Sequence, residues 1–238
     1  MSHPNKSAYH VPFANRIARI VLRPLFRAVF HLFSPIKISG MENVPKRGAY
    51  IVAINHVSLF EAPFIVAFWP SELEAMGASD IWERKGQNLL VRLYHGIPVH
   101  RGEYDRELFD QVLSVLNSGR PILIAPEGGR SHQPGMNRAY PGIGYLIEKA
   151  QVAVIPVGIV GTTDDYLAKA IHLKRPPLEM HIGKPLRFPP IQEKGENRRK
   201  LRQYVADYVM VKIAELLPPE YRGIYANFSL PPIGEGIQ

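Results

Sequence analysis

The stretch "AYIVAINHVSLFEAPF", residues 49–64, contains the pattern of a buried strand, a polar loop and the start of a helix. Its first part, "AYIVAI", is apolar without alternation, as in strands of a parallel sheet that is covered on both faces. Pro63 favours a helix that begins near residue 61 or 62, because proline is best tolerated in the first helical turn. The loop between them follows the carboxyl end of a strand, where open α/β sheets place their chemistry.

Strand-like and helix-like segments alternate from residue 36 onward. The predicted strands are 49–54, 73–78, 96–100, 121–126, 152–160 and 178–183. The predicted helices are roughly 61–69, 81–94, 104–118, 141–150 and 196–217. Short apolar runs separated by helical patterns predict an α/β fold with a central, largely parallel sheet flanked by helices. Within the fifth strand, Pro156 requires an edge position or a bulge.

The chain divides into three parts on this pattern. We expect an N-terminal amphipathic helical segment (1–35), one main domain (36–217) and an irregular C-terminal tail rich in proline and glycine (218–238). The sequence shows no signal peptide and no apolar run near the ~18 residues of a membrane-spanning helix. We therefore expect no conventional transmembrane span.

The composition excludes several kinds of site. The 238 residues include no cysteine, so disulfides, zinc–thiolate centres and cysteine nucleophiles are excluded. A net charge of +8 favours polyanionic partners such as anionic lipid, phosphorylated substrates or nucleic acid. Nucleic acid is the less favoured partner, because the basic residues cluster on an apolar N-terminal segment without an aromatic platform or a recognised motif.

Residues 14–33, "ANRIARIVLRPLFRAVFHLF", combine basic residues at spacings of three or four with an otherwise apolar sequence. In a helix the basic residues form one stripe, which on a wide apolar body is typical of an interfacial membrane helix. Pro24 predicts either two short helices or a kink. The alternative is a helix docked on the domain core with its arginines in water. The predicted membrane contacts are Arg16, Arg19, Arg23, Arg27, Phe26 and Phe30.

His56 and Glu61 form a candidate catalytic pair within the opening stretch. In a continuous helix, five residues would leave the two side chains about 140° apart. If the helix begins at residue 61 or 62, however, 57–60 form a turn and Glu61 can fold back to orient the imidazole. A metal pair is less favoured, because the segment lacks the two helical histidines of a zincin motif. On these two residues alone, a structural histidine remains the alternative.

Two later loops carry candidate anion ligands. Arg101 follows a strand and precedes a helix, a position from which a guanidinium can bind phosphate or carboxylate. In "APEGGRSHQPG" (125–135), the paired glycines 128–129 predict a tight turn whose amides can form an anion nest. Arg130 adds a forked donor, which Glu127 can orient unless Glu127 instead binds a substrate hydroxyl.

Taken together and in this order, these segments resemble the motifs of the glycerolipid acyltransferase family, most closely the 1-acyl-sn-glycerol-3-phosphate acyltransferases. The family's Asn-His-x-x-x-x-Asp is matched by Asn55, His56 and Glu61, and its Gly-x-(Ile/Phe)-x-x-Arg by "GIPVHR", which ends at Arg101. Its Pro-Glu-Gly-Thr-Arg-Ser appears as "PEGGRS", which ends at Ser131, and its Val-Pro-Val-(Gly/Ala) as "IPVG", which includes Pro156. The resemblance covers about residues 36–190.

The resemblance implies a glycerol-3-phosphate acyltransferase-like fold and a specific reaction. A fatty acyl group would move from acyl-CoA or acyl carrier protein to the free hydroxyl of a lysophosphatidate-type glycerolipid, without a covalent intermediate. No cofactor or metal is implied beyond this acyl co-substrate. His56 would be the general base and Glu61 its orienting acid. The remaining implied roles are phosphate binding by Arg101, Gly128 and Arg130, substrate positioning by Glu127 and Gly129, and support of the motifs by Asn55, Ser131 and Pro156.

The sequence departs from the family's pattern at two positions. Glu61 stands where the family has aspartate, and Gly129 stands where it has threonine. The departures leave the general class intact but open the identity of the acceptor, with glycerol 3-phosphate, another lysophospholipid or a glycolipid as alternatives. A non-catalytic membrane lipid-binding protein on the same scaffold is a further alternative. We expect an anionic membrane surface as partner, with the protein peripheral or monotopic on the cytoplasmic face.

Overall fold

A seven-stranded sheet forms the centre of the molecule, of which the computed structural model describes residues 9–100 and 105–231. The strands are β1 (Ile36–Ser39), β2 (Tyr50–Ile54), β3 (Glu74–Ala78), β4 (Ile97–Val99), β5 (Ile122–Ile124), β6 (Ala153–Val160) and β7 (Leu178–Ile182). Their order across the sheet is β1-β7-β6-β2-β5-β3-β4, and only β6 and β7 pair antiparallel. The predicted largely parallel sheet is confirmed.

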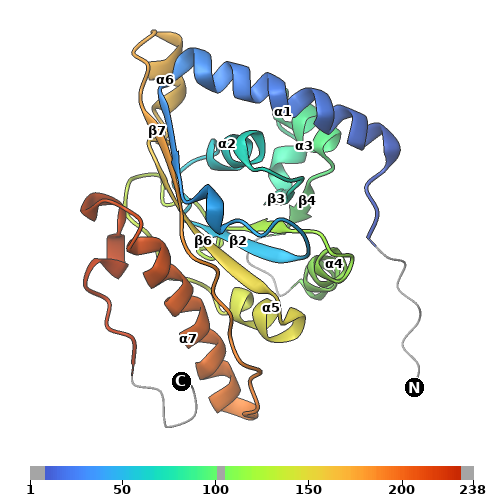
Figure 1. Cartoon of the computed structure of the whole chain (residues 1–238), viewed down its shortest axis with the longest axis vertical. Helices are drawn as coiled ribbons and strands as arrows, with labels where there is room; N and C mark the ends of the chain where they lie inside the picture. The colour runs from blue at the N-terminus through green and yellow to red at the C-terminus, as the bar shows by residue number, and fades with distance from the viewer. Residues whose placement is uncertain (1–8, 101–104, 232–238) are drawn as a thin grey trace.

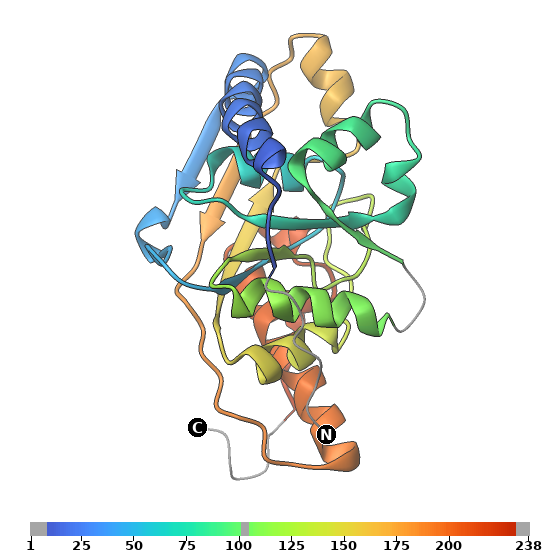
Figure 2. The same cartoon turned by 90° about the vertical axis from the view of Figure 1, so that its right-hand side faces the viewer.

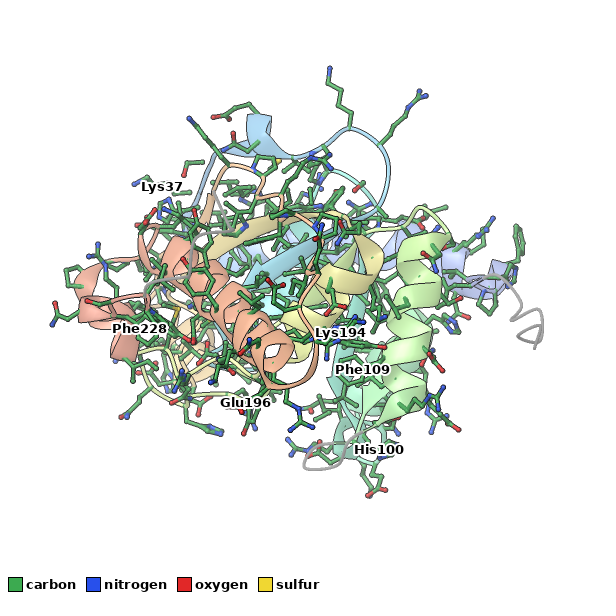
Figure 3. All side chains as sticks on the ribbon, turned by 90° about the horizontal axis from the view of Figure 1, so that it is seen from below. Lys37, His100, Phe109, Lys194, Glu196 and Phe228 are labelled. Atoms are coloured by element: carbon green, nitrogen blue, oxygen red, sulfur yellow. The ribbon has the colours of Figure 1, made fainter. Side chains whose placement is uncertain are left out.

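Helices cover both faces of this sheet (Figures 1 and 2). They are α1 (Phe13–Phe33), α2 (Glu61–Phe68), α3 (Gln87–Tyr94), α4 (Arg106–Asn117), α5 (Gly142–Ala150), α6 (Tyr166–Ile171) and α7 (Gly195–Ala214), with short 3₁₀ turns η1 (Met41–Asn43), η2 (Ser79–Trp82), η3 (Pro219–Tyr221) and η4 (Gly223–Asn227). One core lies between the sheet and α4, α5 and α7, and a second lies between the sheet and α1, α2 and α6. Figure 3 shows the first layer from below, where Phe109 of α4 points toward α5 and its ring centre lies 5.2 Å from that of Tyr145.

The position of β2 between the two cores explains why its apolar sequence has no alternation. Ile51 and Ala53 face the core under α5 and α7, whereas Tyr50, Val52 and Ile54 face the core under α2. All five side chains are buried, as expected for a central strand covered on both faces.

Some short elements differ from the sequence-based expectation. β1 has only four residues, alternates in burial and lies at one edge of the sheet, so its apolar pattern is weak. α6 has only six residues and was also not predicted. The helix expected over 81–94 is instead η2 followed by α3, because residues 83–86 form a turn between them.

Pro156 lies within β6, between two neighbouring strands, at a β-bulge. Val157 pairs with Ile182, whereas Val154, three residues earlier, pairs with Leu186, four residues beyond Ile182. The extra residue on that side bulges the pairing beside Pro156, which has no N–H to donate. Of the two positions predicted for Pro156, the structure shows the bulge.

α1 is one helix, so Pro24 does not divide it into two short helices. Pro24 has no N–H to donate to the carbonyl of Ile20 one turn earlier. Both residues lie on the exposed side of α1, where water can satisfy that carbonyl. The helix therefore continues through the proline.

Three arginines of the basic stripe of α1 bind the protein itself, although Arg27, like Arg16, remains exposed. Arg19, Arg23 and Arg27 donate hydrogen bonds to backbone carbonyls at the C-terminal ends of α2 and α3. The acceptors are Tyr94 for Arg19, Val66 and Trp69 for Arg23, and Ala67 for Arg27. The last carbonyls of a helix lack intrahelical donors and carry partial negative charge, so cations are favourable there. The stripe thus caps two helices of the domain.

Arg19 differs most clearly from the predicted membrane contact, because its side chain is 0% exposed. Its guanidinium forms a double hydrogen bond with Glu74 of β3, at 2.8 and 2.6 Å. Burial alone would raise the pKa of Glu74, but the hydrogen bonds and charge of Arg19, together with the Tyr9 hydroxyl and the charge of Arg120, outweigh burial and lower it. Phe30 is likewise buried, against Phe64 and Tyr166.

The opposite side of α1 is apolar and exposed. Seven large side chains there are 43–76% exposed, namely Phe13, Ile17, Ile20, Val21, Leu25, Val29 and Leu32. We call this set the α1 apolar face. Of the predicted membrane contacts, Arg16 stays exposed and Phe26 is half-buried. No helix in 9–100 or 105–231 is long and apolar enough to cross a bilayer.

The segment after α7 contains only 3₁₀ turns but packs firmly on the domain. The Tyr225 hydroxyl donates to Asp207 Oδ1 at 2.7 Å and accepts from the Ala139 amide at 2.9 Å. The Tyr221 hydroxyl accepts from the amide of Gly161 at 3.0 Å. The described part of the expected tail, residues 218–231, therefore reaches the loop that follows β6.

Candidate active site

The candidate site lies where three neighbouring strands end. β6, β2 and β5 are adjacent and parallel, so the loops that follow them meet at the same edge of the sheet. These loops begin at Asn55 after β2, at Ala125 after β5 and at Gly161 after β6. The strand order thus brings together two of the segments that sequence analysis singled out, and adds a third.

His56 and Glu61 are in direct contact. His56 Nδ1 lies 2.9 Å from Glu61 Oε2. Residues 57–60 turn the chain, and Glu61 is the first residue of α2, so its side chain reaches back as the position of Pro63 predicted. The Glu61 side chain is 0% exposed and that of His56 is 19% exposed. The imidazole is therefore held from inside while its outer edge remains accessible.

Other donors surround the Glu61 carboxylate. The Ser58 amide donates to Oε1 at 2.9 Å, and the Thr162 hydroxyl donates to the same oxygen at 2.6 Å. The Ser58 hydroxyl accepts from the Phe60 amide, as expected for a turn residue. Because the neighbours are donors, Glu61 is an acceptor, and His56 Nδ1 carries the hydrogen between them. His56 Nε2 is then free to accept a proton.

Asn55 fixes the start of the loop. Its amide side chain donates to the carbonyl of Ile159 in β6 and accepts from the Ile159 amide, at 2.9 and 2.8 Å. This pair of hydrogen bonds from a fully buried asparagine ties the end of β2 to β6. Asn55 therefore supports the site through the backbone, in the sense that the motif resemblance implied.

The loop after β5 runs alongside the His56 loop. The Ser131 amide donates to the His56 carbonyl at 2.9 Å, and the His132 amide donates to the Val57 carbonyl at 3.2 Å. Pairing of the two loops brings Arg130, the residue before Ser131, to the same end of the sheet. The side chain of His132 forms a second, exposed histidine–acid contact, 2.9 Å from Asp164.

Glu127 contacts backbone rather than an open substrate position. Its Oε1 accepts from the His56 amide at 2.9 Å and its Oε2 from the Asn137 amide at 2.7 Å. Burial raises the pKa of Glu127 to about 7, against the lowering effect of these two donors and with a further rise from the nearby charge of Glu61. Glu127 therefore holds the backbone of His56, and its expected role in substrate positioning stays a prediction.

Gly128 uses its amide within the turn. At φ +67° it adopts a conformation that favours glycine, and its N–H donates to the Ala125 carbonyl at 3.1 Å. The predicted contribution of this amide to an anion nest is therefore wrong. Next to it, Gly129 faces open space, so a side chain such as threonine would fit there.

Arg130 has a buried nitrogen without a partner. Within the described residues, its Nε has no hydrogen-bond partner. Buried donors are nearly always satisfied, and an unsatisfied one in a native structure calls for an explanation. An anion bound beside the loop would supply the missing acceptor.

The prediction for Arg101 falls on a residue outside those that the structure describes. In the described part of the chain, no group of three or more histidine, aspartate or glutamate side chains is arranged to hold a metal ion. Thr162, Tyr221 and the His132–Asp164 pair were not identified from sequence. Their contacts with the site depend on the neighbouring strand positions of β2 and β6, for which short motifs give no signal.

The chain is similar to known proteins in sequence and in fold. Residues 35–160, just over half of the 238-residue chain, match the family model described as Acyltransferase. The chain is also similar to the crystal structure of the 1-acyl-sn-glycerophosphate (LPA) acyltransferase, PlsC, from Thermotoga maritima. The TM-score is 0.62 and the identity 24%, with 85% of this chain and 80% of that chain covered. The match confirms the predicted fold.

Proposed function

Because this chain belongs to the acyltransferase family, we propose that it transfers a fatty acyl group from an acyl-thioester to the free hydroxyl of a lysophosphatidate-type glycerolipid. Family membership makes it an O-acyltransferase, and the acceptor and donor are the new content of the proposal. The observation that carries it is the contact between His56 and the buried Glu61, in the first of the acyltransferase motifs. The PlsC protein of similar fold is described as acting on 1-acyl-sn-glycerophosphate.

The geometry supports a direct acyl transfer, without a covalent acyl-enzyme, with His56 as general base. Glu61 holds the Nδ1–H of His56, so Nε2 takes the proton of the acceptor hydroxyl. The acceptor oxygen bonds to the thioester carbonyl carbon, and the carbon–sulfur bond breaks as the tetrahedral intermediate collapses. The imidazolium, stabilised by the Glu61 carboxylate, returns the proton to the departing thiolate. The protein ends each cycle in its starting protonation state.

Acceptor binding is assigned to the loop after β5. The unpaired Nε of Arg130 supports a contact with the acceptor's phosphate, because an arginine guanidinium offers several donors in one plane. Arg101 belongs to the same proposal through its motif. Gly129 leaves room beside Arg130 that the family's threonine would occupy, which supports an acceptor head group somewhat larger than phosphate as the second candidate.

Membrane contact is assigned to the α1 apolar face rather than to the arginine stripe. Exposed apolar side chains also occur on α3 (Leu89 and Leu90) and on or just after α6 (Leu167, Ile171 and Leu173). These helices adjoin α1 at the same end of the molecule (Figures 1 and 2). Exposed Lys174 and Arg175 follow α6, so the apolar surface has a basic border that suits an anionic membrane.

The apolar surface adjoins the candidate active site. Tyr166 begins α6, and its ring lies 5.1 Å from that of Phe60 in the His56–Glu61 turn and 6.3 Å from that of Phe30 in α1. A lipid acceptor bound at this surface would therefore lie near the turn that carries His56. The acceptor's acyl chain can remain in the membrane while its hydroxyl reacts.

An acceptor panel tests the function. Purified protein is incubated with radiolabelled acyl-CoA or acyl carrier protein and with lysophosphatidate, other lysophospholipids, glycerol 3-phosphate or a lysoglycolipid, and the products are separated by lipid chromatography. We expect labelled phosphatidate from lysophosphatidate, and loss of product and of thiol release in His56→Ala. Turnover in the folded His56→Ala protein would refute the base assignment. Preference for another acceptor would refute lysophosphatidate, and binding without turnover would favour a non-catalytic lipid-binding protein.

A further inference from the structure

Thr162 lies outside the four motifs yet touches the catalytic pair. It is the second residue after β6, its side chain is 0% exposed, and its hydroxyl donates to Glu61 Oε1 at 2.6 Å. We propose that Thr162 is a positioning residue for acyl transfer, which holds the Glu61 carboxylate so that Oε2 faces Nδ1 of His56. The inference rests on the proposed function, because it concerns the same base.

Glu61 needs such a donor because it is a buried acid without a permanent cation. Among the described residues, no lysine or arginine forms an ion pair with Glu61, and its ionic partner there is His56. A buried carboxylate keeps its charge only when hydrogen bonds replace the lost water. The hydroxyl of Thr162 donates to Oε1, and the amide of Ser58 is shared between Oε1 at 2.9 Å and Oε2 at 3.2 Å, so Thr162 is the side chain that binds the oxygen opposite the imidazole.

The length of the Glu61 side chain is a second reason why the Thr162 hydroxyl matters. Glutamate has one more rotatable bond than aspartate, so its carboxylate can adopt more orientations about a fixed Cα. Donors on Oε1 from two different loops restrict that rotation. Thr162 comes from the loop after β6 and Ser58 from the turn before α2, so the carboxylate is held from two directions.

Thr162 itself is rigidly placed. Gly161, the preceding residue, has φ +94°, and a Cβ there would lie 2.1 Å from the Pro177 carbonyl oxygen. The amide of Gly161 donates to the hydroxyl of Tyr221 in η3. Threonine is also stiff about χ1 because its Cβ is branched. The hydroxyl therefore acts as a fixed reference point for Glu61.

The test compares variants that keep or remove one hydroxyl. Thr162→Val preserves the shape of the side chain, and Thr162→Ser preserves the hydroxyl. The matched control is Thr163→Val, because the neighbouring Thr163 also donates to a carboxylate, that of Asp165, at 2.5 Å but away from His56. Steady-state kinetics of thiol release and thermal unfolding are measured for each full-length protein, with Thr162→Ala as a second deletion of the hydroxyl if the valine variant does not fold.

We expect Thr162→Val to lower kcat about 10- to 100-fold, as for loss of one hydrogen bond to a charged group, with little change in either KM. Thr162→Ser should recover most of the activity, and Thr163→Val should match the unmodified protein. Adding Thr162→Val to Glu61→Gln should cause no further loss, because the positioned carboxylate is already gone. Wild-type kcat in Thr162→Val and Thr162→Ala, or additive losses in the double variant, would overturn the inference. If His56→Ala also retained turnover, the assignment of His56 as the base would fail as well; if His56→Ala were inactive, only the role of Thr162 would fail. The proposed function itself would fail if the unmodified protein formed no labelled phosphatidate in the acceptor panel.

Discussion

Glu61 begins α2 and its side chain reaches back across the 57–60 turn. The donors around its carboxylate lie at the distance that a glutamate side chain reaches. Ser58, Thr162 and His56 bind its two oxygens at 2.6–2.9 Å. An aspartate at the same Cα would fall short of this position by about 1.5 Å, the length of one carbon–carbon bond. The departure from the family's aspartate is therefore matched by the surrounding contacts in this chain.

Replacing Glu61 separates its length from its charge. We expect Glu61→Asp to remain active with kcat/KM lowered about tenfold, because the charge stays but the hydrogen bonds lengthen. Glu61→Gln should lose at least about 100-fold, because an amide neither fixes Nδ1–H equally well nor stabilises the imidazolium. Thiol release by the purified proteins measures both. Wild-type turnover in Glu61→Gln would refute the orienting role of Glu61.

The sequence allowed the His56–Glu61 contact to be predicted because it is local. Pro63 limits where α2 can begin, and that boundary decides whether the two side chains meet. Thr162 is 101 residues away from Glu61, and the contact arises only because β6 lies beside β2. Glu127 was found by its motif, but its backbone partners, His56 and Asn137, depend on how two loops pair in three dimensions.

At the scale of elements, the spacing of charges on α1 predicted two faces but not which face meets the protein. Arginine can extend into lipid head groups or cap helix ends, and both uses produce the same period. The structure selects capping, because the C-terminal ends of α2 and α3 lie under the stripe and present unsatisfied carbonyls. The apolar side of α1 is consequently the outer one.

If the α1 apolar face contacts the membrane, changes on that face should weaken binding to vesicles. Charged residues at Val21 and Leu25 (Val21→Asp with Leu25→Asp) should weaken binding to anionic vesicles by at least about tenfold, because two apolar side chains no longer enter the bilayer. Binding is measured by co-sedimentation with vesicles of phosphatidylglycerol and phosphatidylcholine. The matched control is Ile224→Asp, which changes an exposed apolar residue of η4. Equal binding by all three proteins would refute membrane contact through α1.

At the scale of the whole molecule, buried carboxylates join the layers. Glu74 of β3 accepts hydrogen bonds from Arg19 of α1, from Arg120 before β5 and from the Tyr9 hydroxyl, so it ties the outer helix to the sheet. Removing one partner of such a buried pair lowers the free energy of unfolding strongly, because the other charge stays buried without its partner. The outer helix α1 and the sheet are therefore connected by charge as well as by apolar packing.

Glu127 joins the loops of the site in the same manner but with the opposite effect on pKa. Burial raises its pKa from 4.5 to about 7. A carboxyl that binds its proton more tightly when folded stabilises the native state below its unfolded pKa, and this contribution is lost as the pH rises through about 7. The shift corresponds to about 3 kcal/mol in the free energy of unfolding.

The Glu127→Gln variant isolates this dependence, because glutamine has the same size but does not titrate. We expect the free energy of unfolding of the unmodified protein, minus that of Glu127→Gln, to fall by up to about 3 kcal/mol between about pH 5 and about pH 8. Urea unfolding followed by circular dichroism at several pH values measures the difference. Glu193→Gln, at an exposed glutamate, provides the control for the loss of one carboxylate charge. A difference that stays flat or rises with pH would show that Glu127 is not protonated more readily in the folded protein.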